Sequence, residues 1–150
     1  MKQFVCATIS SLALCAMAVG PGAAQAEILL IGSGQIHFNQ ISKTKLRDLY
    51  TGQSQSVGDS AVLVIDRRDD FDQKEGFISN TLGFTSEEFL TVQRLLECIG
   101  ISKAPTVARD GKHTIELLAN NPNALGYVTR DELVHNAGRA KLKFIKVLAE

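Results

Sequence analysis

The stretch AVLVIDRRDDFDQKEGF, residues 61–77, decides how the chain is organised. Residues 61–65 are all apolar, which is typical of a strand buried on both faces. The spacing of Phe71, Phe77, Ile78 and Leu82 then predicts a helix over about 70–82. A buried strand that runs directly into a helix is the building unit of an α/β fold with a parallel sheet.

The same alternation continues on both sides of this stretch. Strands are predicted at 28–31, 124–128 and 142–148. Helices are predicted after four capping residues, which are Ser42, Thr85, Asp110 and Thr129. We therefore predict an α/β fold, with a mostly parallel sheet flanked by helices.

The helix after Thr85 has the clearest sequence pattern. Thr85 and Glu88 form a capping box, and Gly100 stands where a helix-ending glycine belongs. One apolar stripe is expected to face the core, with Leu95 at its middle: Phe89, Val92, Leu95, Leu96 and Ile99.

Residues 1–26 have the pattern of a secretory signal peptide. Lys2 precedes an apolar stretch, and small residues end in Ala24-Gln25-Ala26. The apolar stretch is shorter than the ~20 residues that cross a bilayer, so we expect cleavage and no membrane span in the mature protein. Residues 27–150 would then form one periplasmic or secreted domain, in which Cys98 is expected to be a buried apolar residue.

Composition and motifs argue against several function classes. The chain has sixteen basic and sixteen acidic residues and no basic run, so nucleic acid is not expected as a partner. Its three histidines, His37, His113 and His135, lack the short spacing of a zinc site. Patterns of a nucleophile with a base are also missing, so we expect no enzyme, no metal and no cofactor.

Two short segments are candidate ligand-binding elements. Arg67 and Arg68 follow a strand, where a planar guanidinium can hold an oxyanion through two parallel hydrogen bonds. Ser33 and Gly34 belong to a Gly-Ser-Gly turn whose amides could meet the same anion. In the competing interpretation the turn is only a tight turn, and the arginines pair with nearby acids: Asp66, Asp69, Asp70 or Asp72.

Three segments together resemble a known family. They are ISKTKLRDLYTGQ (41–53), AVLVIDRRDDFDQKEGFISNTLGFTSEEF (61–89) and IGISKAPTVARDGKHTIELLANNPNALGYV (99–128). In order and spacing they are similar to short phosphate-type solute-binding proteins of ABC transporters. The resemblance implies one lobe of a type II periplasmic binding protein and a small anion, phosphate first, as the ligand.

The chain departs from the full-size phosphate binders in two respects. Those proteins are about twice as long, and they follow the arginine with a Ser-Gly-Thr turn that grips the oxyanion, where this chain has Asp69-Asp70-Phe71-Asp72. Two functions therefore stand at this point. One is an exported oxyanion-binding protein that serves an ABC transporter or sensor, and the other is an envelope protein-protein interaction module that kept the fold without the ligand.

Overall fold

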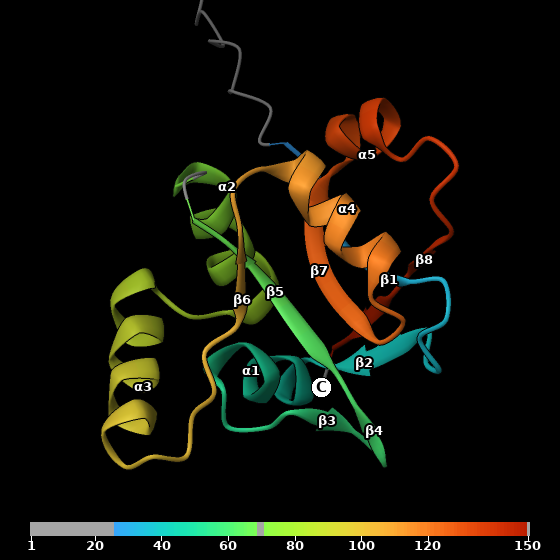
Figure 1. Cartoon of the computed structure of the whole chain (residues 1–150). Coiled ribbons are helices and arrows are strands. Elements are labelled where there is room, and N and C mark those ends of the chain that lie inside the picture. Colours follow the sequence, from blue (N-terminus) through green and yellow to red (C-terminus); the bar gives the residue numbers. More distant parts are fainter. Residues whose placement is uncertain (1–25, 69–70, 150) are drawn as a thin grey trace, which may run out of the picture.

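The structure, a computed structural model, describes residues 26–68 and 71–149 (Figure 1). Almost all of the predicted signal peptide, residues 1–26, lies outside the described residues. Among those that are described, no helix is long and apolar enough to cross a membrane.

A five-stranded sheet organises the fold. Its strands stand in the order β6 (Thr106–Ala108), β5 (Leu63–Arg67), β7 (Ala124–Thr129), β1 (Ile28–Ser33) and β8 (Leu142–Phe144). β6, β5 and β7 run parallel, and β1 runs antiparallel to both β7 and β8. Four of the five strands thus point the same way, which confirms the mostly parallel sheet.

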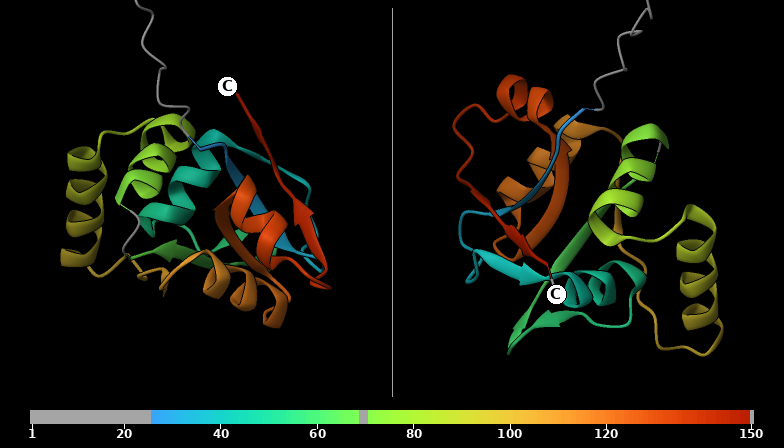
Figure 2. Two further views of the ribbon diagram at one scale, coloured as in Figure 1. Left: turned by 90° about the horizontal axis from the view of Figure 1, so that it is seen from above. Right: turned by 180° about the vertical axis from the view of Figure 1, so that it is seen from behind.

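Helices cover both faces of this sheet (Figure 2). On one face the core includes residues of α1 (Lys43–Thr51), of the π-helix η1 (Phe77–Leu82) that continues α2 (Phe71–Gly76), and of α3 (Ser86–Cys98). On the other face α4 (Gly111–Asn120) and α5 (Arg130–Asn136) pack against β7. The remaining strands form two small pairs, β2 (Gln40–Ser42) with β9 (Lys146–Leu148) and β3 (Ser56–Val57) with β4 (Ser60–Ala61).

Two predicted strands have different bounds from those expected. The apolar run 61–65 is divided at Val62, and β5 continues to Arg67, so this arginine belongs to the strand itself. The predicted strand 142–148 is divided at Ile145, whose amide donates to the Leu30 carbonyl at 3.0 Å. Ile145 is buried, and from there the chain leaves β1 and pairs with β2.

The prediction for the buried face of α3 is wrong at Leu95. The Thr85–Glu88 capping box is present, but Phe89 is the buried residue of this helix and Leu95 is 61% exposed. α3 lies at the side of the fold, in contact with α1 and η1 (Figure 1). Leu95 follows Phe89 by six residues, which turns it about 120° around the helix and out of that contact. Cys98 is exposed as well, contrary to expectation.

We predict that Phe89→Ala lowers the free energy of unfolding by about 3–5 kcal/mol, because it leaves a cavity against α1 and η1. Leu95→Ala on the same helix is the matched control and should change it by no more than about 0.5 kcal/mol. Urea unfolding followed by circular dichroism measures both values. Equal losses in the two variants would contradict the placement of α3.

Candidate functional site

Arg67 is a buried charge at the carboxyl end of the sheet. It is the last residue of β5, and its side chain is 1% exposed. Successive residues of a strand face opposite sides, so Arg67 shares the α4 and α5 side with Ile65, while Asp66 faces the other side. A buried guanidinium is stable only with a counter-charge and hydrogen-bond acceptors around it.

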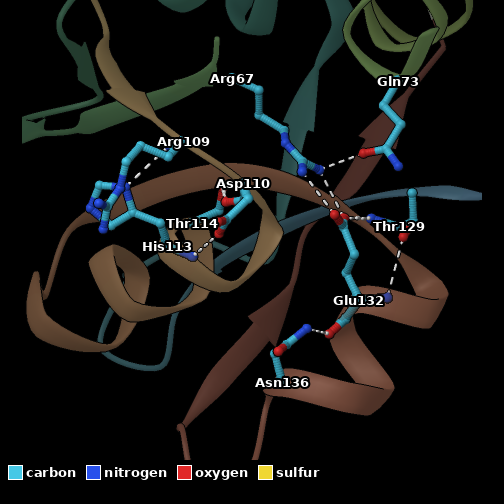
Figure 3. A network of polar contacts seen from close by, with 9 residues as sticks. All are labelled: Arg67, Gln73, Arg109, Asp110, His113, Thr114, Thr129, Glu132 and Asn136. Atoms are coloured by element: carbon cyan, nitrogen blue, oxygen red, sulfur yellow. Dashed lines mark hydrogen bonds and ion pairs between the residues drawn. The ribbon is translucent and has the colours of Figure 1, made fainter. Parts of the chain in front are cut away.

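Glu132 of α5 supplies that counter-charge (Figure 3). One terminal nitrogen of Arg67 donates to Oε2 of Glu132 and the other to Oε1, each at 2.8 Å. This is the two-bond geometry with which a guanidinium recognises a carboxylate or a phosphate. Gln73 of α2 accepts a further hydrogen bond from Arg67 at 2.5 Å.

The carboxylate of Glu132 is fixed by its own helix as well as by Arg67. Thr129 and Glu132 form the capping box of α5, in which the Thr129 amide donates to Oε2 of Glu132 at 2.9 Å. A side chain at Gly111 would clash with this carboxylate, so the glycine lets α4 begin directly beside it. Burial raises the pKa of Glu132, but the bonds from Arg67 and Thr129 and the charge of Arg67 outweigh it, and the pKa lies below its ordinary value.

The start of α4 adds further charges near Arg67. Asp110 caps the helix by accepting from the amide of His113 at 2.8 Å. That hydrogen bond, with the nearby charges of Arg109, His113 and Arg67, lowers the pKa of Asp110. Nδ1 of His113 in turn accepts from the Arg109 amide at 3.1 Å. The site is therefore mixed in charge, although a buried arginine is at its centre.

Asp66 belongs to a separate polar cluster on the opposite face. Its carboxylate accepts from Lys74 at 2.6 Å and from the Tyr127 hydroxyl at 2.8 Å. Tyr127 stacks on Phe77 with a ring separation of 3.9 Å. Burial and the charge of Asp66 raise the pKa of Tyr127 far above the physiological range, so this tyrosine is a neutral donor.

The two predicted ligand-binding elements do not meet. β5 and β7 begin together, where Leu63 pairs with Ala124, and β1 ends at that same edge, where Gly32 pairs with Leu125. Ser33 and Gly34 therefore lie at the opposite edge of the sheet from Arg67 and Arg68. The expectation of one shared site is wrong because β1 runs antiparallel to its neighbours.

The Gly32-Ser33-Gly34 turn also uses its polar groups internally. The Gly34 amide donates to the Lys141 carbonyl at 2.8 Å, and a Cβ on Gly34 would approach that oxygen to 2.7 Å. Ser33 is 4% exposed. The geometry thus agrees with a tight turn that brings two chain segments together.

Glu132 is the partner of Arg67 that the sequence interpretation missed. The acids proposed as partners of the arginines lie close in sequence; of these, Asp66 pairs with Lys74, and Asp69 and Asp70 lie outside the described residues. A signal was nevertheless present. Glu132 follows the strand parallel to β5, and the carboxyl ends of neighbouring parallel strands share one edge of the sheet.

Neither of two surface hollows includes Arg67. One, of about 560 Å³, lies between β1 and the segment 144–149, and the other, of about 360 Å³, lies at the amino end of β5 beside Lys103. Within residues 26–68 and 71–149 no group of three His, Cys, Asp or Glu side chains could hold a metal ion. Arg67 is thus in a filled site, occupied by Glu132.

We predict that Glu132→Ala lowers the free energy of unfolding by about 3–5 kcal/mol, because it leaves a buried guanidinium without its counter-charge. Glu88→Ala is the matched control, since Glu88 has the same capping-box position in α3 and no buried arginine. Chemical unfolding of both variants should give a clearly smaller loss for Glu88→Ala. Similar losses would mean that Glu132 acts only as a helix cap.

The Glu132 bond should also make stability depend on pH. A carboxyl whose pKa is lowered by folding stabilises the protein above its ordinary pKa, here 4.5, and this contribution is lost as pH falls through the lower folded value. Unfolding of the wild type and of Glu132→Gln should therefore differ most above pH 4.5 and converge below it. A constant difference down to acid denaturation would contradict this assignment.

The sequence matches no protein-family model and no curated protein. Solved structures do match. The chain is similar to an ABC-type phosphate transport receptor from Vibrio cholerae, with 16% identity and a TM-score of 0.60. It is similar to PstS from Borrelia burgdorferi, with 19% identity and a TM-score of 0.63. A third match, from Clostridium perfringens, was solved with bound phosphate and is assigned as a phosphate ABC transporter substrate-binding protein, with 19% identity and a TM-score of 0.58.

These matches cover 81% of this chain and between 45% and 47% of the solved proteins. The chain thus spans less than half the length of the structures it resembles. At such identities the likeness establishes the fold. The chain has an α/β fold that is similar to about half of each of these solved solute-binding structures.

Proposed function

We propose that the chain is an exported solute-binding-like protein that recognises a small oxyanion, with phosphate as the first candidate, for an ABC transporter or a sensor. The observation that carries the proposal is the bidentate grip of Arg67 on a carboxylate. A buried arginine with both terminal nitrogens directed at two oxygen atoms is the chemistry of oxyanion recognition. The occupant in this structure is Glu132.

The position of Arg67 supports the same function. Ligands of open α/β sheets bind beyond the carboxyl ends of the strands, and Arg67 ends β5 at that edge. Arg68 follows it there and is exposed, so it can contribute charge to an arriving anion. Ser33 and Gly34 lie at the other edge, and we leave them out of the proposed site.

Binding is expected to be weak. The Glu132 side chain at this position is 21% exposed, so an anion there stays partly in water, where charge-assisted bonds are screened. The Glu132 carboxylate also competes for the same two nitrogens of Arg67. We therefore expect a dissociation constant near millimolar, which corresponds to about −4 kcal/mol.

Titration calorimetry of the purified protein with phosphate, sulfate and acetate tests this function. We expect weak phosphate binding that decreases as salt is added. Arg67→Lys keeps the charge but loses the planar two-bond geometry, so it should weaken phosphate binding at least about tenfold. Ser33→Ala, at the opposite edge, is the control and should bind like the wild type. Equal affinity in the wild type and Arg67→Lys would place the anion elsewhere.

The second candidate is the envelope interaction module. It is favoured by the ion pair between Arg67 and Glu132, because this guanidinium has a counter-charge without any ligand. Exposed apolar side chains on and after α3, Leu95, Ile99 and Ile101, agree with a surface that meets another protein. If none of the three anions binds to the wild type at low salt, this second function replaces the first.

A further inference from the structure

We propose that Glu132 is a displaceable internal ligand, whose carboxylate occupies the oxyanion position of Arg67 and must leave before an external oxyanion can bind. The inference concerns the regulation of the site described above and rests on the proposed function only in its choice of phosphate as the ligand. Three hydrogen bonds define the occupied position, two from Arg67 and one from the Thr129 amide.

An incoming anion cannot add to this arrangement. Both terminal nitrogens of Arg67 are directed at Glu132, and one of them also donates to Gln73. The side chain of Arg67 is 1% exposed, so solvent does not reach the guanidinium along another path. Recognition of two oxygen atoms in the plane of the guanidinium therefore requires exchange with the Glu132 carboxylate.

Of the two partners, Glu132 is the one that can move. Arg67 lies in β5, a central strand that is bonded to β6 on one side and β7 on the other. Glu132 lies in α5, which has seven residues and no buried residue. Its side chain is 21% exposed, and the carboxylate is held by its bonds to Arg67 and Thr129. Withdrawing this side chain costs these bonds and little apolar burial.

The space left by the Glu132 carboxylate has the size and polarity of a small oxyanion. It is bounded by Arg67, Gln73 and the Thr129 amide (Figure 3). Gly111 also borders it, and the absence of a side chain there keeps the start of α4 close. The charges of Arg109 and Arg67 both act on Asp110, which caps α4. Both terminal nitrogens of Arg67 bind a carboxylate at this position, so a small anion with two oxygen atoms in one plane is the ligand class that would replace it.

Glu132→Ala tests the proposal, with acetate as the probe that restores the missing carboxylate and phosphate as the candidate ligand. Thermal unfolding of Glu132→Ala should shift upward as either anion is added, because a ligand that binds only the folded state stabilises it. Titration calorimetry should give phosphate affinity at least about tenfold tighter than in the wild type. Glu88→Ala loses the equivalent capping glutamate and should show neither effect.

Two further variants test whether Arg67 binds the anion and cover the case in which Glu132→Ala does not fold. Arg67→Gln combined with Glu132→Ala removes the guanidinium and should abolish the gain in affinity. If Glu132→Ala does not fold without an anion, folding restored by acetate or phosphate supports the proposal. If it does not fold even then, Glu132→Gln, which keeps the shape of the side chain and removes its charge, takes its place and should bind phosphate more tightly than the wild type.

The results separate this inference from the proposed function. Phosphate binding by Glu132→Ala that is no tighter than in the wild type would overturn the inference and leave the proposed function in place. Phosphate binding by Glu132→Ala and none by the wild type would support the inference and remove oxyanion recognition from the native protein. A gain that persists without Arg67 would overturn the inference, because the anion would then bind another group.

Discussion

The bond between Arg67 and Glu132 is the interaction on which the carboxyl edge of this sheet depends. It joins the end of β5 to α5, and through Gln73 it reaches α2 as well. The glutamate carboxylate that pairs with Arg67 also caps its own helix and rests on the first residue of α4. Residues of β5, α2, α4 and α5 thus meet around one ion pair, because a buried charge needs a counter-charge and hydrogen-bond acceptors.

The strand β5 carries two neighbouring charges, Asp66 and Arg67, and each is paired on a different face of the sheet. Asp66 and Arg67 are adjacent, yet their side chains face different sides of the sheet, so they do not neutralise each other. Asp66 is bonded to Lys74 and to Tyr127, whose ring stacks on Phe77 in the larger core. Arg67 is bonded to Glu132 over the smaller core. Two oppositely charged neighbours at a strand end therefore form two separate, largely buried ion pairs, one on each face of the sheet.

Much of this fold could be predicted from the sequence, because its signals are local. The caps at Ser42, Thr85, Asp110 and Thr129 follow from the chemistry of one helical turn, and each is present. The predictions that are wrong all depend on where an element lies in the fold, which the local sequence does not show. The period of α3 identified an apolar face but not which part of it would meet α1, so Leu95 was placed inside. The local sequence also does not show the direction of a strand. Because β1 runs antiparallel to β7, Ser33 lies at the opposite edge of the sheet from Arg67. Glu132 lies 65 residues beyond Arg67 and was recognised only as a cap.

The burial of Arg67 also limits which states the site can have. A guanidinium at 1% exposure cannot remain without a counter-charge, since the cost of an unpaired buried charge is a large fraction of the stability of a domain. In the folded chain the Glu132 carboxylate supplies a counter-charge through two hydrogen bonds of 2.8 Å. Any ligand that reaches Arg67 is consequently coupled to the Thr129–Glu132 cap, because the carboxylate that it displaces is the one that begins α5. If an external oxyanion displaces Glu132, the N-terminal cap of α5 changes with it, so α5 is the element through which a bound anion would be sensed.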